Sequence, residues 1–456
     1  MFKKVTLISF IFFFSGLSAF ASCVIKEVSF DGYWQEEHHR LYREILNEPC
    51  SALEKANQTV IEWHENHGFP AAKIQSKISE DGKVKVILVR GEAWVWASPE
   101  NQGKTKTKKN LWPKITGIEE GKPFSLSEIK KAESQVLRLG YYDKAKETQL
   151  YKDGRRNRLV PVFYMKDRPI NHLEGFLSYS SEHKEYTGSI EIALLNMIGT
   201  ARDLYLEGET GLWGRSLSLK YKEPWLFSTA WNGLIRGMID EDSLTQKALL
   251  ELGVSRRIGA ELDFAILGGI GNDEWRTALE VNYLTLDRFI LPRSGISFDA
   301  SMTVIQKRDS SENALVAITA SGYYLIPIFR TGVARFSFGT GTLLPSRENN
   351  ALEDLFALGG VSSFKGYRNG FFRSRAYGYS ECMLEWQAAN STAFQAFYQP
   401  GIYRARAPEH GWKEINSYGL GISQYRDRWN ISIYYAMNLE SSFLEGLLHL
   451  NVKTLF

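Results

Sequence analysis

The sequence carries little net charge and, beyond its first 21 residues, has no apolar run of 18 residues. The absence of such a run argues against a bundle of transmembrane helices. The 55 Lys and Arg residues are nearly balanced by 52 Asp and Glu residues, which leaves a net charge of +3. This balance argues against a highly charged disordered chain and against a nucleic-acid-binding protein with a strongly basic surface. We therefore expect no nucleic-acid partner.

Common motifs of enzyme and cofactor sites are also missing. The sequence has no G-x-S-x-G, no Walker-type phosphate loop and no cluster of Cys and His at metal-ligand spacing. His64-Glu65-Asn66-His67 departs from the H-E-x-x-H zinc motif, and we interpret it as a solvated helix end. We therefore expect no catalytic residue, no metal, no cofactor and no enzymatic activity.

What is present favours a large, aromatic, glycine-rich protein. The chain has 456 residues, enough for two or more domains, and it is 44% hydrophobic and 13% aromatic with 38 Gly. Its mean hydropathy is −0.27. That value is compatible with a membrane protein built of β-strands, because apolar and polar residues alternate in such strands and average out.

The N-terminus predicts export from the cytoplasm. Lys3 and Lys4 precede an apolar run over residues 5–14, and Ala19-Phe20-Ala21 has the A-x-A pattern of a cleavage site. We predict a secretory signal peptide over residues 1–21. Two alternatives stay open: a retained membrane anchor, and a lipoprotein modified at Cys23, although the usual Leu three residues before that Cys is missing.

Three cysteines suit an oxidising compartment. Cys23 and Cys50 both lie in the first exported segment, where a disulfide between them is one expectation and two unpaired thiols are the other. Cys382 is interpreted as a small apolar side chain.

Residues 22–91 predict a small α+β domain with the order β-α-α-β-β. A strand ends at Asp31-Gly32, and a helical stretch follows over residues 41–46. Ser51 and Glu54 form a capping-box pattern before a second helix that Gly68 ends. Two strands are expected over residues 72–80 and 83–90.

Residues 92–169 repeat this plan. Ser125 and Glu128 give a second capping-box pattern, Gly140 follows the helix, and strands are expected near residues 146–151 and 158–165. The irregular opening of this copy carries a basic run, which we interpret as a solvated loop rather than a contact to anionic lipid; its lysines are Lys104, Lys106, Lys108 and Lys109.

From about residue 170 the hydrophobic period changes from 3.6 to 2. About sixteen candidate strands start near residues 172, 187, 201, 214, 229, 246, 260, 275, 295, 314, 331, 375, 391, 416, 428 and 446. A soluble sandwich shows the same alternation, but the signal peptide and tryptophans near strand ends favour a membrane barrel over residues 170–456. An even strand number closes such a barrel without edges. One connection is long, at residues 346–374, between the eleventh and twelfth strands.

The chain closes on an amphipathic strand ending in an aromatic residue. Leu450, Val452 and Phe456 share one face of it. A terminal strand with a final Phe is similar to the C-terminal signal of bacterial outer-membrane barrels.

Several short motifs accompany this organisation. They are Gly68-Phe69-x-x-Ala72, Gly140-Tyr141-Tyr142, Asn196-x-x-Gly199-Thr200-Ala201-Arg202, Tyr221-x-Glu223-Pro224 and Asp287 to Pro292-x-x-Gly295. With them the chain resembles the superfamily of BamA, TamA and the two-partner secretion transporters, also called the bacterial surface antigen family. The resemblance covers nearly the whole exported chain. It implies two periplasmic POTRA domains followed by a 16-stranded β-barrel in the outer membrane of a Gram-negative bacterium.

The most specific motif lies in the long connection. Residues 358–367 resemble the G-G-x-x-x-V-R-G-[YF] motif of that superfamily, with Phe and Lys in place of Val and Arg; its marked positions are Gly359, Gly360, Phe364, Lys365, Gly366 and Tyr367. In the superfamily the Arg folds into the barrel lumen and pairs with acidic residues. The resemblance implies that Lys365 pairs with Glu381 and Glu385, which share one face of the twelfth strand. A Lys cannot make the bidentate fork of an Arg, so a less rigid loop is expected.

The resemblance also implies a function. We expect a factor that accepts unfolded outer-membrane or secreted clients at its POTRA domains and inserts or passes them at the barrel, in contact with outer-membrane lipid and with a periplasmic or inner-membrane accessory protein as a further partner. A transporter for one dedicated secreted passenger and a passive diffusion pore are the alternatives.

Overall fold

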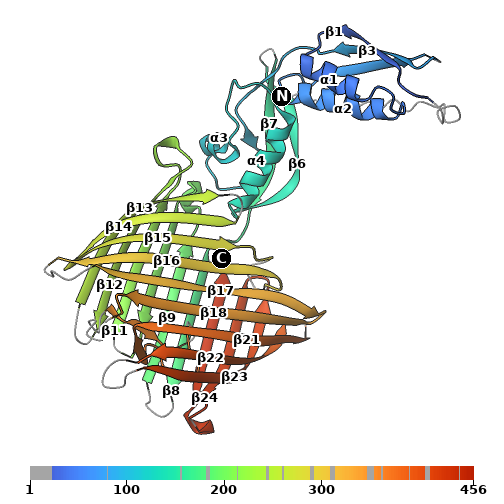
Figure 1. Cartoon of the computed structure of the whole chain (residues 1–456). Coiled ribbons are helices and arrows are strands. Elements are labelled where there is room, and N and C mark those ends of the chain that lie inside the picture. The colour runs from blue at the N-terminus through green and yellow to red at the C-terminus, as the bar shows by residue number, and fades with distance from the viewer. Residues whose placement is uncertain are drawn as a thin grey trace. The chain divides into compact units, whose positions relative to one another are not determined.

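The computed structural model describes residues 23–456, except 80, 155–156, 181–184, 213, 243–245, 259–260, 288–291, 309–313, 347–353, 361–362, 390, 406–410 and 441. The signal peptide expected over residues 1–21 lies outside the described residues. The chain forms two compact units that divide between Arg168 and Pro169 (Figure 1).

The first part of the N-terminal unit has the predicted order β-α-α-β-β. Its elements are β1 (Glu27–Gly32), α1 (Glu36–Glu44), α2 (Ala52–Glu65), β2 (Lys73–Ile78) and β3 (Lys83–Val89). The helix α1 begins at Glu36, five residues before the expected start. Strand β3 is central, parallel to β1 and antiparallel to β2. Apolar side chains of the two helices cover this sheet and form a core that includes Ile25, Tyr42, Leu53, Val60, Val84 and Val86.

Cys23 and Cys50 form a disulfide, with their Cα atoms 5.5 Å apart. The amide of Cys50 also donates to the carbonyl of Cys23 at 3.0 Å. The bond therefore fixes the segment before β1 to the start of α2. A sulfur engaged in this disulfide is not available for the lipid of a lipoprotein.

The second part of the N-terminal unit differs from the first at its opening. The expected irregular stretch holds β4 (Val95–Trp96), β5 (Glu100–Asn101), a 3₁₀ turn η1 (Lys109–Leu111) and α3 (Trp112–Thr116). The longer elements are α4 (Leu126–Arg138), β6 (Tyr142–Lys152) and β7 (Arg158–Asp167). Strands β4 and β5 run parallel to one side of β7, and β6 pairs antiparallel with its other side. The four lysines of the basic run are exposed, as expected of a solvated loop.

The two predicted capping boxes are wrong. Ser51 and Ser125 make no side-chain hydrogen bond that caps α2 or α4. The Ser125 hydroxyl instead donates to Asn66 at 3.0 Å, and the Glu128 carboxylate accepts from the indole of Trp96 at 2.6 Å. At the second box, partners from distant parts of the chain thus take the groups that a local cap would use. At the first, Ser51 has helical φ and ψ angles and not the extended conformation of a capping residue.

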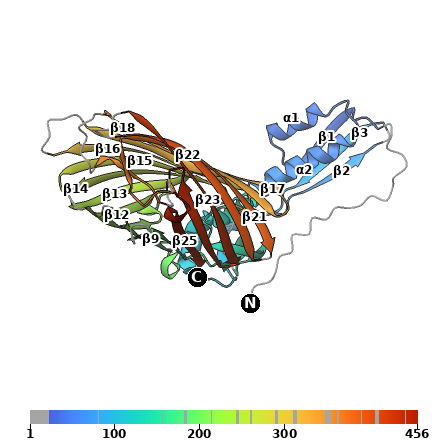
Figure 2. The same cartoon turned by 90° about the horizontal axis from the view of Figure 1, so that it is seen from below.

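The second unit confirms the predicted closed barrel of sixteen strands, with every neighbouring pair antiparallel (Figure 2). Each strand begins within four residues of its expected position. The strands are β8 (His172–Ser180), β9 (Glu185–Leu194), β10 (Asp203–Thr210), β11 (Gly214–Glu223), β12 (Asn232–Asp242), β13 (Gln246–Ile258), β14 (Leu262–Gly271), β15 (Glu274–Leu284), β16 (Gly295–Lys307), β17 (Leu315–Phe329), β18 (Gly332–Leu344), β21 (Ala376–Ala389), β22 (Thr392–Arg404), β23 (Trp412–Arg426), β24 (Trp429–Asn438) and β25 (Leu447–Leu455).

The wall of the barrel alternates as a membrane barrel does. On β13, Leu250 and Leu252 face outward with 56% and 59% of their surface exposed, whereas Glu251 between them is 3% exposed and faces the lumen. On β21, Leu384 and Trp386 are outward and exposed, and Glu381 is buried. The apolar outer face and the polar inner face give each strand its period of two.

The ends of the barrel follow from the strand order. We call the end at which β8 begins the proximal end and the opposite one the distal end. The last residues of β25 pair with the first of β8, so the C-terminus lies at the proximal end. The connection between β18 and β21 starts at the distal end. Among the described helices, none is long and apolar enough to cross a membrane.

Candidate functional site

The candidate site is the connection between β18 and β21, here called the motif segment (residues 345–375). It contains a two-stranded hairpin of β19 (Phe356–Leu358) and β20 (Phe372–Ser374). The tip beyond this hairpin is buried: Phe364 is 0% and Lys365 9% exposed. Its polar partners come from inward-facing positions of the wall, as the following contacts show. The motif segment therefore folds back into the lumen.

Three glycines of the motif are required by the backbone. Gly359 and Gly360 have φ angles of +125° and +76°, a region that side chains disfavour. The amide of Gly359 donates to the hydroxyl of Ser363, which donates back to the Gly359 carbonyl. A Cβ at Gly366 would lie 2.7 Å from the Met437 carbonyl oxygen, so only Gly lets the tip approach β24 so closely.

Lys365 forms an ion pair with Glu381 on β21. Both side chains are almost fully buried, and the Lys365 ammonium also lies 5.2 Å from the centre of the Phe397 ring. The Ser337 hydroxyl donates weakly to the same carboxylate at 3.5 Å. A buried carboxylate without its cation would be costly, so the pair holds the tip against the β18–β21–β22 wall.

Glu385 does not share this role. Its carboxylate accepts a hydrogen bond from the Gln395 amide at 2.7 Å. Four residues along a strand span roughly 13 Å, so one ammonium does not bridge both glutamates. Because Glu381 and Glu385 are an even number of residues apart on one strand, the sequence placed both side chains on the same face. It did not give the distance from either side chain to Lys365.

The aromatic positions of the motif form a cluster of their own. Phe364 stacks edge-on against Tyr379 with ring centres 5.1 Å apart, and its ring lies against Gly401 of β22. Tyr367 packs on Phe372 of β20 at 4.8 Å. A Phe at position 364 thus fills the space between the tip and the wall.

Two polar residues that the sequence did not single out hold the backbone of the tip. The amide of Lys365 donates to the Gln399 side chain at 3.2 Å, and Gln399 in turn binds the Ser363 carbonyl. The His449 ring on β25 contacts the Lys365 carbonyl through Nε2 and the Ser178 hydroxyl of β8 through Nδ1. For His449, the only signal in the sequence was that a polar residue occupies an inward-facing position of the last strand.

The rest of the motif segment reaches other parts of the wall. The Asn369 amide donates to Glu209 of β10 at 2.6 Å, and the Asn369 carbonyl accepts from Leu212 at 3.0 Å. Asp354 pairs with Lys247 of β13 at 3.5 Å and with Lys307 of β16 at 3.1 Å. The segment is therefore tied to several sides of the lumen.

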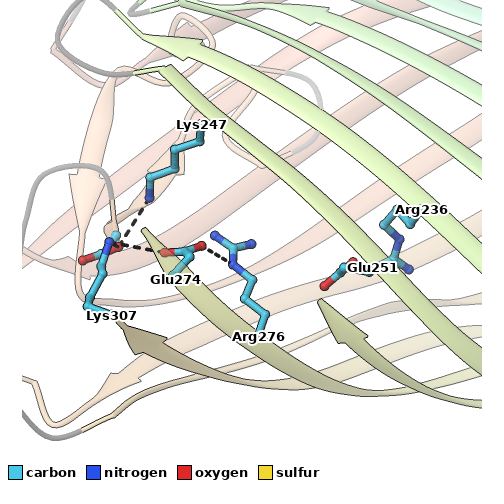
Figure 3. A network of polar contacts seen from close by, with 7 residues as sticks. Arg236, Lys247, Glu251, Glu274, Arg276 and Lys307 are labelled. Carbon is cyan, nitrogen blue, oxygen red and sulfur yellow. Dashed lines mark hydrogen bonds and ion pairs between the residues drawn. The ribbon is translucent and has the colours of Figure 1, made fainter. Parts of the chain in front are cut away.

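The contact at Asp354 belongs to a larger charge network at the distal end. Glu274 is 5% exposed, and its carboxylate contacts Arg276 and Lys307 (Figure 3). Further along the wall, Arg236 pairs with Glu251 at 3.1 Å and with Glu280 at 2.7 Å. Alternating signs thus neutralise the buried charges of this wall.

The terminal strand closes the barrel. Leu450 and Val452 lie on its outer face opposite Leu177 and Gly175 of β8. The amide of Phe456 donates to the Asn171 carbonyl at 2.8 Å, and its side chain is 55% exposed. The terminal residues expected to carry a barrel signal therefore lie on the outer side of the seam between β25 and β8.

Part of the barrel matches a family model. Residues 265–394, from β14 to β22, match the Omp85 superfamily domain. This span includes the motif segment and Glu381. No curated protein sequence matches the chain.

Solved structures match over nearly the whole chain. BamA from Haemophilus ducreyi lacking POTRA domains 1–3 is 14% identical, covering 95% of this chain and 100% of that chain with a TM-score of 0.57. CdiB from Acinetobacter baumannii is 13% identical, with 95% and 90% covered and a TM-score of 0.59. CdiB from Escherichia coli is 13% identical, with 100% and 94% covered and a TM-score of 0.56. At these identities the likeness is one of fold. The chain thus carries an Omp85 superfamily domain within a barrel of the BamA and CdiB type, as the motifs of the sequence indicate.

Proposed function

We propose that the protein is an outer-membrane insertion or translocation factor for unfolded client proteins. The superfamily match and the BamA and CdiB folds support a role in outer-membrane protein assembly or secretion in general, and a 16-stranded barrel fits a Gram-negative outer membrane. In this proposal residues 22–91 and 92–169 are two periplasmic POTRA domains, and the barrel inserts the client or passes it outward.

The observation that carries the proposal is the buried tip of the motif segment. Lys365 pairs with Glu381, and the carbonyl of the same residue contacts His449 at the closing seam. A passive pore has no need for an inward segment joined to its last strand and, through His449, to its first strand. A factor that opens its wall or lumen for a client needs a part that holds the closed state.

The N-terminal unit offers edges on which a client could form an additional strand. Strand β2 pairs only with β3, and β6 only with β7, in the described part of the chain. An extended peptide can add a strand to such an edge and gain main-chain hydrogen bonds. The free energy for insertion or passage then comes from client folding and burial, because the chain has no nucleotide-binding motif.

Quantitative proteomics of the outer membrane and the culture medium, with and without the gene, tests the proposal. A fall in several unrelated barrel proteins would identify an insertion factor. Loss of one large protein from the medium or cell surface, with barrel proteins unchanged, would identify a dedicated secretion transporter. No change in either fraction, together with lower solute permeability, would support the passive pore instead.

Removing residues 22–169 separates the two units. We expect client handling to be lost while the barrel still folds, which heat-modifiable migration in gels would show. Full function of the truncated chain would contradict a client-accepting role for the N-terminal unit.

A further inference from the structure

Two turns at the proximal end of the barrel are built on one plan. They connect β9 to β10 and β11 to β12, and they read Met-Ile-Gly-Thr-Ala at residues 197–201 and Leu-Phe-Ser-Thr-Ala at residues 226–230. We call them the twin turns. Because β10 and β11 are paired neighbours, the twin turns lie on adjacent hairpins.

The twin turns share three hydrogen bonds. The amide of Met197 donates to the Arg202 carbonyl at 2.8 Å, and that of Leu226 to the Trp231 carbonyl at 2.7 Å. In the first turn the amide and the hydroxyl of Thr200 both donate to the Met197 carbonyl. In the second turn the amide and the hydroxyl of Thr229 donate to the Leu226 carbonyl in the same way. The shared sequence therefore specifies the shared geometry.

Backbone strain is concentrated in the twin turns. The twin turns and the residue that precedes each of them hold five of the seven non-glycine residues with positive φ in the described chain: Asn196, Ile198, Ala201, Trp225 and Phe227. The left-handed conformation is a genuine outlier for a β-branched residue such as Ile198, with φ of 52°, and for the bulky Phe227, with φ of 50°. Strain of this kind persists where the surroundings enforce it, and it marks functional positions.

The strained conformation turns one apolar side chain of each turn outward. Ile198 is 87% and Phe227 89% exposed, more than any other large apolar side chain among the described residues. Leu226, the neighbour of Phe227 in the sequence, instead lies against Gly233 of β12. The two projecting side chains occupy the same position of their turns, so the projection belongs to the plan of the turn.

The wall beside the twin turns has the character of a membrane interface. Arg202 and Glu223 form a fork on the outer face, with Nε–Oε2 at 2.9 Å and Nη2–Oε1 at 3.0 Å. The Tyr221 hydroxyl donates to the same carboxylate. Nearby, the Arg256 guanidinium lies over the Trp231 ring at 5.6 Å. Paired charges and amphipathic aromatic rings are the groups that lipid head-group regions accommodate.

The apolar outer band continues directly from this zone. Leu217 and Leu219 of β11 face outward, with 56% and 39% of their surface exposed. Along this hairpin the outer surface changes from apolar side chains to paired charges and rings, and then to the tips of the twin turns. We propose that the twin turns insert Ile198 and Phe227 into the head-group region of the phospholipid leaflet at the proximal end, as a two-point anchor.

This anchor depends on the barrel spanning a membrane and not on client handling. It gives a physical reason for the strain: an apolar side chain held outward gains contact with lipid, whereas in water it gains nothing. Continuity with the lipid-facing wall favours lipid over a protein surface as the occupant.

Single-cysteine labelling of the full-length protein tests the anchor. Cys382 is replaced by Ser, and Ile198→Cys or Phe227→Cys is labelled with the polarity-sensitive dye NBD. The proteins are reconstituted in vesicles of phosphatidylethanolamine and phosphatidylglycerol with phosphatidylcholine spin-labelled near its head group. Leu252→Cys on the outer wall serves as the lipid reference and Glu440→Cys, exposed at the distal end, as the water reference.

The anchor predicts blue-shifted emission at both turn positions and quenching by the spin-labelled lipid several-fold above that at Glu440→Cys. Emission as in water, with quenching by iodide and none by lipid, would overturn it. Protection from iodide without quenching by lipid would also overturn it and would indicate a protein contact. Heat-modifiable migration of each labelled variant shows that the barrel is folded. Thr200→Ala and Thr229→Ala together relax both turns and should reduce the lipid quenching.

Discussion

His449 and Ser178 lie opposite each other across the seam where the last strand, β25, meets the first, β8, and the His449 ring joins the Ser178 hydroxyl on one side to the Lys365 carbonyl on the other. His449 is fully buried. The tip of the motif segment and the closure of the barrel therefore share one side chain. The two hydrogen bonds of His449 therefore connect the position of the tip to the closure of the seam.

Replacing His449 with Ala should loosen the seam and the tip together. The substitution leaves the buried Lys365 carbonyl and Ser178 hydroxyl without this partner, which costs about 1–3 kcal/mol per unsatisfied group. We expect the barrel to unfold at a lower temperature in heat-modifiable gel migration. Asn451→Ala, two residues along the inner face of the same strand, is the matched control. Equal stability of the His449→Ala variant and the control would show that the hydrogen bonds of the His449 ring do not stabilise the barrel.

Replacing Lys365 with Ala should destabilise the barrel more than replacing both members of its ion pair. The single substitution leaves the Glu381 carboxylate buried and uncompensated, a loss of about 3–5 kcal/mol. Glu381→Gln in the Lys365→Ala background removes that charge and should restore part of the stability. Thermal unfolding of the four proteins of this cycle measures the coupling. Additive effects would mean that the pair does not hold the tip.

The sequence predicts the barrel well because its signal is periodic. Strand after strand, an apolar residue alternates with a polar one, and a registered wall such as that of β11 and β12 follows from this pattern. The motif segment could be predicted for a different reason, since Gly359 and Gly360 mark positive φ angles that no other residue adopts easily.

What the sequence could not predict depends on distances between remote residues. The alternation of side chains along a strand put Glu381 and Glu385 on one face, but only the fold decides which of them reaches Lys365. The capping box at Ser125 failed because Asn66 and Trp96 bind Ser125 and Glu128, and the one at Ser51 failed because Ser51 has helical φ and ψ angles. His449 and Gln399 belong to no sequence motif. They bind the backbone of the tip only because the fold brings β22, β25 and the tip together.

Acid should weaken the first α+β domain of the N-terminal unit. His64 is 1% exposed, so the interpretation of residues 64–67 as a solvated helix end is wrong at this residue. Burial, followed by the nearby His38 and Arg90, lowers the pKa of His64 from 6.5 to about 4. None of the four ring nitrogens of His38 and His64 has a hydrogen-bond partner in the described part of the chain. Below pH 6.5 the unfolded chain takes up a proton at His64 that the folded chain does not, so the free energy of unfolding falls as the pH drops towards 4.

Hydrogen exchange of the full-length protein, resolved to residues 23–91, measures this dependence. Protection should be constant above pH 6.5, after correction for intrinsic exchange, and should decrease between about pH 6.5 and 4. Burial also lowers the pKa of His38, so His64→Leu removes one of two acid-sensitive rings and should make the profile less steep. A profile in His64→Leu as steep as that of the unchanged protein would assign the acid response to other groups.

Reducing the Cys23–Cys50 disulfide should destabilise the same domain without affecting the barrel. The bond closes a loop of 27 residues in sequence, for which chain entropy predicts a stabilisation of about 3–4 kcal/mol. Exchange protection over residues 23–91 should fall in Cys23→Ala/Cys50→Ala, while heat-modifiable migration of the barrel stays unchanged. Cys382→Ala, which removes a free thiol, is the control. A lower barrel transition in the double variant would mean that the two units depend on each other for stability.

Asp354 should hold the motif segment in the lumen independently of Lys365, because it pairs with Lys247 and Lys307 on a different part of the wall. Asp354→Ala leaves Glu274 as the carboxylate that the structure places against the cations of this network (Figure 3). The excess positive charge should then draw water and anions between the wall and the segment, which favours displacement of the segment and raises the conductance of the barrel in planar bilayers. Lys307→Met in the same background removes one cation and should return the conductance towards its original value. Unchanged conductance in Asp354→Ala would show that the contacts of Lys365 and Asn369 suffice to keep the lumen filled.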